Sequence, residues 1–255
     1  MSHGELSEPA SIEPAIDTLS PLRDAFHLTA EALRVVLPRL GFFLKTALLI
    51  FAPLELFVYL WNTWVPDTTG EAIFAEAIDM LCLIVGEAVY FPVCLYAYVK
   101  TKDDKSAPAL APALRYALGR FPRLLLFAVA YTLLTLVGLL LLIVPGVYWS
   151  VRYSFGAVIA SACPASLTDT FAQSKALTQG RFWRVLAVAF IPLCCSFILT
   201  IVVWSLFYLL LTLTLWLPFD TIGYLFVSDL FLPIPFLALA LLHERLTSEP
   251  IALAS

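Results

Sequence analysis

Five ionisable residues stand inside long apolar stretches of this sequence, where a charge is costly: Glu55, Asp79, Glu87, Arg152 and Asp229. A charged side chain near the centre of a membrane helix costs ~2.5–3.5 kcal/mol on insertion scales, so such residues face one another or a wet cavity. Counted along their spans at ~1.5 Å per residue, four of the five fall in one outer layer, and Glu87 lies deeper. We therefore expect Arg152 to pair with at least one of Glu55, Asp79 and Asp229.

Two kinds of chemistry suit this intramembrane polar cluster. A dry ion-pair network would only fix helix packing, whereas a hydrated one would form a substrate or proton pathway. An enzyme is not expected, because Asp79 and Glu87 are separated by about 12 Å along one helix, too far for two carboxylates to act together. No catalytic triad, H-E-x-x-H or phosphate-loop pattern occurs. The five cysteines and three histidines are scattered, so we expect no disulfide framework, metal or cofactor.

The elements that position these residues must be membrane helices. The chain is 61% hydrophobic and 13% charged, with a mean hydropathy of +0.92. Soluble proteins carry ~25% charged residues, so an ordinary soluble enzyme and a disordered regulator are excluded. A net charge of −4 gives no basic surface for nucleic acid. The composition predicts an all-α, polytopic membrane protein.

We expect one integral membrane domain over 20–245, between a disordered acidic tail (1–19) and a short tail (246–255). The first residues lack a basic segment followed by an apolar one, so no cleaved signal peptide is expected. At ~20 residues per span, six transmembrane helices are predicted near 41–62, 75–98, 124–143, 147–165, 185–212 and 221–242. Pro145 and Gly146 are predicted to form the turn between the third and fourth spans.

Two or three amphipathic helices are expected at the membrane interface, near 20–39, 110–123 and 166–180. In the first, apolar residues recur at helical spacing: Phe26, Ala30, Leu33 and Leu37. In the third, Ser166 or Thr168 is the expected N-cap, and Gly180 the left-handed residue after the helix.

The basic residues are segregated along the chain. Of the 15 Lys and Arg, all but Arg152 fall on one side of a six-span arrangement. Because basic loops stay in the cytoplasm, both termini are predicted to be cytoplasmic.

A short motif, G-R-F-x-R, occurs at 119–123 and again at 180–184, and a weaker version, PRLGFFLKTALL, lies at 38–49. These copies suggest a three-fold repeat of an interfacial helix plus a hairpin. In each motif, aromatic rings suit headgroup depth and arginines suit lipid phosphate, either for anchoring or as a specific anionic-lipid site. The interface residues are Arg120, Phe121, Arg123, Arg181, Phe182, Trp183 and Arg184.

Residues 141–184 carry a longer pattern: V-P-G-V-Y at 144–148, Arg152-Tyr153, Ser174, and G-R-F-W-R at 180–184. This resembles poorly characterised prokaryotic six-span membrane proteins related to the membrane domain of some glycerophosphoryl diester phosphodiesterases. The resemblance implies an integral protein of the prokaryotic cytoplasmic membrane, with Arg152 at a characteristic position. The phosphodiesterase activity itself does not transfer, because no soluble catalytic domain is present.

Three classes of function are compatible with these features. The first is an inner-membrane accessory or scaffold protein that acts through contacts with lipids, including anionic headgroups, or with a membrane protein partner. The alternative is a small transporter or channel with a polar outer vestibule around Arg152. The third, an intramembrane enzyme, lacks a convergent site.

Overall fold

The computed structural model of the chain describes residues 20–64, 69–104, 108–214 and 231–247, and every regular element in these ranges is helical. Four stretches are long and apolar enough to cross a membrane: Ser20–Trp61, Phe74–Lys102, Leu110–Leu141 and Phe182–Leu206. In these ranges the predicted all-helical fold is confirmed, and the four apolar stretches fit a membrane protein. The described residues supply four such helices, whereas six spans were expected.

Helix α1 (Ser20–Val36) continues through a short 3-10 turn, η1 (Leu37–Arg39), into α2 (Leu40–Trp64). The residues that α1 buries against the protein are Ala25, Leu28, Thr29, Ala32 and Val36. Phe26 and Leu37, which were expected on the packed stripe, are 60% and 58% exposed. The helix is present as predicted, but it is the small, alanine-rich face that packs inward.

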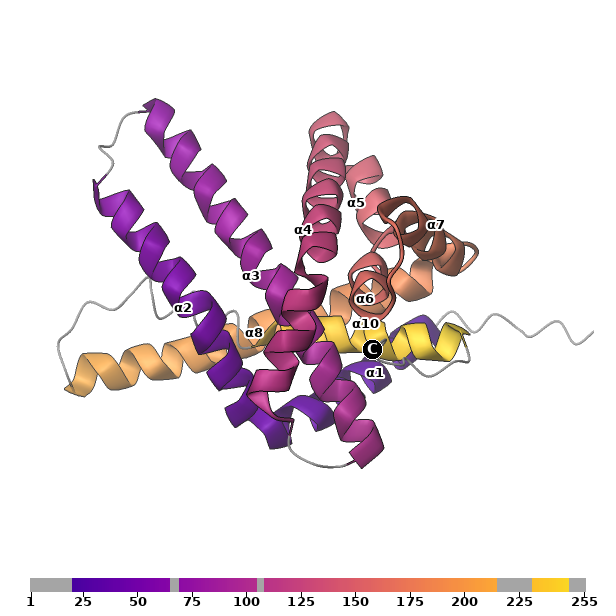
Figure 1. Ribbon diagram of the computed structural model, residues 1–255, viewed down its shortest axis with the longest axis horizontal. Helices are drawn as coiled ribbons and strands as arrows, with labels where there is room; N and C mark the ends of the chain where they lie inside the picture. Colours follow the sequence, from indigo (N-terminus) through magenta and orange to yellow (C-terminus); the bar gives the residue numbers. More distant parts are fainter. Residues whose placement is uncertain (1–19, 65–68, 105–107, 215–230, 248–255) are drawn as a thin grey trace, which may run out of the picture.

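Helix α3 (Thr69–Asp104) returns beside α2 as a hairpin, and α4 (Leu110–Leu141) packs against α3 (Figure 1). The stretch 110–123 was predicted as a separate amphipathic helix, but it forms the first turns of α4. Pro122 lies at the junction and does not end the helix.

Between α4 and α5 (Ile143–Arg152) the chain turns at Leu142, whose φ of −168° and ψ of 146° are extended. The predicted turn at Pro145 and Gly146 is therefore placed three residues too late. Both lie in the first turn of α5, where proline costs little because its N–H would be unpaired anyway. Gly146 instead permits close packing, since a Cβ there would lie 2.7 Å from the backbone N of Leu139.

The predicted fourth span, 147–165, is not one helix. It is divided into α5 and α6 (Gly156–Ala162), with a break at 153–155. At the end of α5, Ser174 Oγ and Thr178 Oγ1 donate hydrogen bonds to the carbonyl oxygen of Arg152, at 3.1 and 3.2 Å. These two hydroxyls satisfy a carbonyl that the break leaves outside the helical ladder.

Helix α7 (Leu167–Thr178) begins and ends as predicted. Ser166 Oγ accepts a hydrogen bond from the backbone N–H of Asp169 at 3.2 Å, so Ser166, rather than Thr168, is the N-cap. Gly180 follows with a φ of 74°, the left-handed conformation that favours glycine after a helix.

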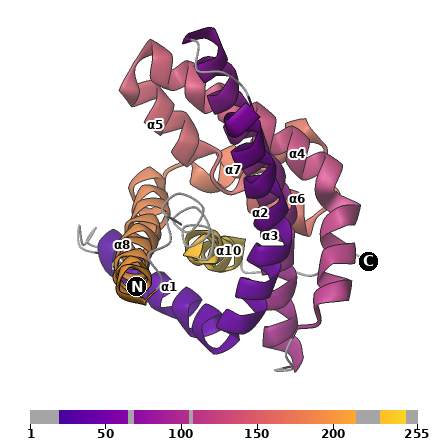
Figure 2. The same ribbon diagram turned by 90° about the vertical axis from the view of Figure 1, so that its left-hand side faces the viewer.

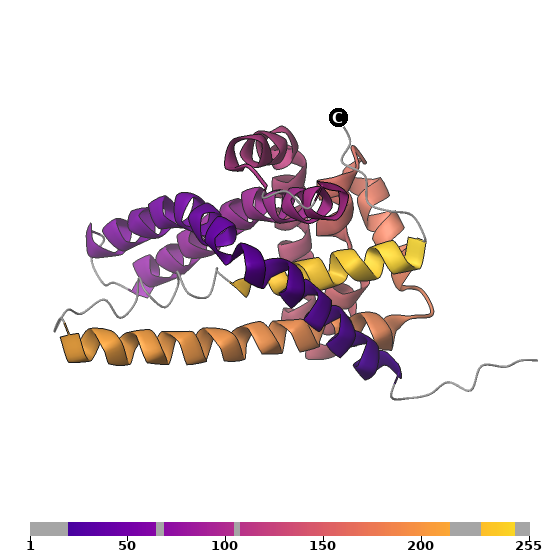
Figure 3. The ribbon, with the colours of Figure 1, turned by 90° about the horizontal axis from the view of Figure 1, so that it is seen from below.

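The long helix α8 (Phe182–Thr214) runs alongside α10 (Pro233–Thr247), and both α10 and α1 pack against it (Figures 2 and 3). Pro233 and Pro235 were expected inside the sixth span, 221–242; they instead lie in the first turn of α10. Residues 215–230, including Asp229, are outside the described ranges. The largest cluster of buried apolar side chains joins α1, α2, α3, α5, α6, α8 and α10.

Candidate functional site

Arg152 lies at the C-terminal end of α5 and is paired with neither Glu55 nor Asp79. Its guanidinium donates a hydrogen bond to the hydroxyl of Tyr148, one turn earlier, and lies 5.3 Å from the centre of that ring. In the described residues Arg152 forms no ion pair. The predicted pairing with Glu55 or Asp79 is therefore wrong, and Asp229 lies outside those residues.

Arg152 and Lys175 together line a small cavity of about 130 Å³ between α5, α7 and the start of α8. The Tyr148 and Phe182 rings stack over it with centroids 5.7 Å apart. Gly180, which has no side chain, exposes its backbone in the wall of the same cavity. Neither cation is paired with a carboxylate in the part of the chain that the structure describes. The cavity therefore combines two positive charges with aromatic and backbone surface, which suits an anionic group.

The acidic residues of the predicted cluster occupy two other places. Glu55 on α2 and Asp79 on α3 lie close enough for their negative charges to interact across the hairpin. Glu87, two turns further along α3, lines a much larger cavity. The structure thus groups Glu55 with Asp79, and separates both from Arg152 and from Glu87.

The larger cavity has a volume of about 710 Å³ and lies between α3, α4, α5, α6, α8 and α10. Its walls are mainly apolar and include the rings of Phe91, Phe127 and Phe236. Several wall hydroxyls are already bonded: Tyr131 donates to the carbonyl of Ser150 at 3.2 Å, and Ser154 to that of Val151 at 2.9 Å. Of the residues that line the cavity, Glu87 alone is a carboxylic acid, and none is basic.

The two basic-aromatic motifs have different local structures. In the first, Gly119–Arg123 lies within α4, and the Arg120 guanidinium carbon sits 3.6 Å from the centre of the Tyr116 ring. In the second, Gly180 and Arg181 form the turn before α8. Trp183 is 73% exposed. Phe182 and Arg184 turn inward, to the small cavity and to Asp24 respectively.

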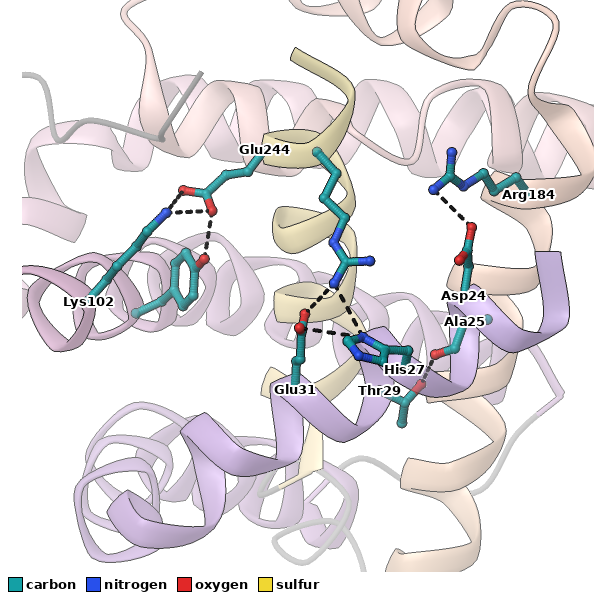
Figure 4. A network of polar contacts seen from close by, with 10 residues as sticks. Asp24, Ala25, His27, Thr29, Glu31, Lys102, Arg184 and Glu244 are labelled. Carbon is teal, nitrogen blue, oxygen red and sulfur yellow. Dashed lines mark hydrogen bonds and ion pairs between the residues drawn. The ribbon is translucent and has the colours of Figure 1, made fainter. Parts of the chain in front are cut away.

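A network of ion pairs, which the sequence analysis did not identify, ties α1 to α8 and α10 (Figure 4). Arg184 pairs with Asp24 at 2.9 Å, and Arg245 pairs with Glu31 at 2.9 Å. Glu244, also on α10, accepts hydrogen bonds from Lys102 of α3 at 2.9 Å and from the Tyr98 hydroxyl at 2.7 Å. The available signal was the presence of carboxylates among the basic residues of α1 and α10: Asp24 and Glu31 in α1, and Glu244 in α10.

Comparison of the chain with protein-family models, with curated proteins and with solved structures finds no match. The candidate sites therefore rest on the chain's own geometry. No group of three or more His, Cys, Asp or Glu suited to a metal ion occurs in the described residues.

Proposed function

We propose that this chain is an integral membrane protein that acts as an accessory or scaffold by binding anionic lipid, with the headgroup phosphate held between Arg152 and Lys175. The observation that carries the proposal is the small cavity in which these two cations lie, neither of them paired with a carboxylate of the described residues. A phosphate between them would accept charge-assisted hydrogen bonds from both side chains.

The surroundings of the small cavity support a membrane-facing ligand. Trp183, beside the cavity-lining Phe182, is largely exposed, as expected of an aromatic residue at headgroup depth. The cavity is too small for acyl chains, which would lie on the exposed apolar faces of α4 and α8. Arg181 adds a further exposed cation at the same turn. These features favour a lipid headgroup with its chains outside the protein.

The test is native mass spectrometry of the protein released from nanodiscs that contain equal amounts of phosphatidylglycerol and phosphatidylcholine. The intact protein should retain phosphatidylglycerol, and Arg152→Gln and Lys175→Gln should each lower the retained fraction at least tenfold. Arg34→Gln and Arg115→Gln are matched controls, because both arginines are exposed and neither lines a cavity. Equal retention by all four variants would overturn the proposal.

A second candidate function, passage of a small solute, is favoured by the larger cavity around Glu87. In this candidate function the solute would pass Glu87, whereas the sequence suggested a vestibule at Arg152. Flux in proteoliposomes that Glu87→Gln abolishes would support it, and flux unchanged by that substitution would exclude this route.

We also propose the finer topology on sequence grounds. In this topology six spans, the last near 221–242, cross a prokaryotic cytoplasmic membrane with both termini inside. The segregation of basic residues supports the orientation, and the pattern over 141–184 supports the resemblance to the phosphodiesterase-associated membrane domains. The repeated G-R-F-x-R supports an internal repeat. Labelling of single cysteines from each side of the membrane tests the topology.

A further inference from the structure

We propose that the larger cavity is a binding site for an apolar organic cation, a positively charged nitrogen or phosphorus centre on an aromatic or alkyl body, with Glu87 as its counter-charge. This inference rests on the second candidate function and names the class of solute that the protein would transport. It concerns binding alone, so it can be tested apart from transport. It is also independent of the lipid proposal, because the two cavities share no lining residue.

The first argument is charge. The ion pairs of the described residues all involve other carboxyl groups, and Glu87 forms no hydrogen bond there either. Outside the described ranges the sequence has a single Lys or Arg, Lys105. In the sequence Lys105 stands 18 positions after Glu87. The part of the chain that the structure describes therefore provides no cation paired with this carboxylate, and a ligand can provide one.

The second argument is the surface around the carboxylate. Aromatic side chains from α3, α4, α8 and α10 line the wall, among them Phe91, Phe127, Phe190 and Phe236. A cation is attracted to an aromatic face as well as to a carboxylate. An anion would meet repulsion from Glu87 without a compensating base. The wall thus favours positive over negative ligands of equal size.

The third argument is volume. At about 710 Å³ the cavity falls in the range of ~300–1,000 Å³ typical of small-molecule sites. It can hold a body of several aromatic rings, which its apolar walls would remove from water. The ligand class is therefore both apolar and positively charged.

The experiment compares two probes that share size and apolar surface but differ in charge: tetraphenylphosphonium and tetraphenylborate. Binding to the full chain in dodecyl maltoside micelles is measured by equilibrium dialysis, with protein-free micelles subtracted. We expect saturable binding of about one tetraphenylphosphonium per chain, and no saturable binding of tetraphenylborate. Glu87→Gln should weaken the cation at least tenfold, whereas Glu55→Gln, a span carboxylate outside the cavity, should leave its affinity unchanged.

A second variant distinguishes the effect of removing the Glu87 charge from the effect of reducing the cavity volume. Ala128→Phe fills the cavity from α4 and should also weaken the cation while Glu87 stays in place, with the thermal unfolding midpoint measured for each variant. Equal binding of the two probes, or unchanged affinity in Glu87→Gln, would overturn the inference. Saturable binding without any flux in proteoliposomes would leave the inference standing and remove the transport candidate.

Discussion

The close contact between α4 and α5 predicts that alanine at Gly146 destabilises the protein. A Cβ at this position would lie 2.6 Å from the Leu139 side chain and 2.7 Å from the Leu139 backbone N. A side chain can rotate away, but the backbone of α4 cannot move without separating the two helices. Overpacking of this kind costs about 1–3 kcal/mol, partly offset by the roughly 1 kcal/mol by which alanine favours helix over glycine.

We therefore expect Gly146→Ala to lower the free energy of unfolding by up to about 2 kcal/mol. Gly138→Ala should act similarly, because its Cβ would lie 2.8 Å from the Cα of Gly146. Gly119 provides the matched control: it lies inside α4 with nothing within 4 Å of its added Cβ. Gly119→Ala should stabilise the protein by about 0.5–1 kcal/mol, from helix preference alone.

The assay is reversible unfolding in dodecyl maltoside micelles by increasing sodium dodecyl sulfate, followed by far-ultraviolet circular dichroism. The informative quantity is the difference in stability between Gly146→Ala and Gly119→Ala, about 1–3 kcal/mol, because the helix preference of alanine is common to both variants. If the two variants are equally stable, the glycines do not hold α4 and α5 together, and the proposed reason for the Pro145-Gly146 pair fails.

Three further predictions use the same unfolding assay. Ser166→Ala should cost about 1 kcal/mol through loss of the α7 cap, and Thr168→Ala clearly less; equal losses would contradict the assignment of the cap. Burial lowers the pKa of His243, and the nearby Glu244 carboxylate opposes this with a smaller effect. His243 therefore binds a proton more readily in the unfolded chain than in the folded one. Stability should therefore fall as pH drops below about 6.5, the usual histidine value, and His243→Phe should flatten that slope; an unchanged slope would assign it to other groups. A double-mutant cycle of Lys102→Met with Glu244→Gln should give a coupling of about 0.5–1 kcal/mol that weakens with added salt; a coupling near zero would show that the contact is neutral.

Features set by neighbouring residues could be predicted from the sequence. Ser166 and Gly180 mark the two ends of α7 because a cap bond reaches only three residues, and the left-handed conformation is a property of one residue. The helical class followed from composition. In α1, two apolar stripes offset by one position are both compatible with a helix. Only contact with α8 and α10 decides that the alanine-rich stripe is buried.

Features set by distant residues could not be predicted. The depth assigned to Arg152 assumed a straight helix from 147 to 165. In the structure α5 ends at Arg152. The carbonyl oxygen of Arg152 accepts hydrogen bonds from the hydroxyls of Ser174 and Thr178, which stand 22 and 26 positions later in the sequence. A contact of that range leaves no periodic signal in the sequence. The predicted charged layer was wrong for the same reason, since counting residues along a span fixes depth only while the helix continues.

The end of α5 also determines which variants can tell the two proposed sites apart. Val151, Tyr153 and Ser154 line the larger cavity, whereas Arg152 lines the smaller one. A change to this backbone would disturb both cavities at once, and a joint loss of lipid and cation binding would identify neither site. Lys175 on α7 and Glu87 on α3 come from helices that each contribute to one cavity only. Their single substitutions can therefore assign lipid binding and cation binding to separate places in the fold.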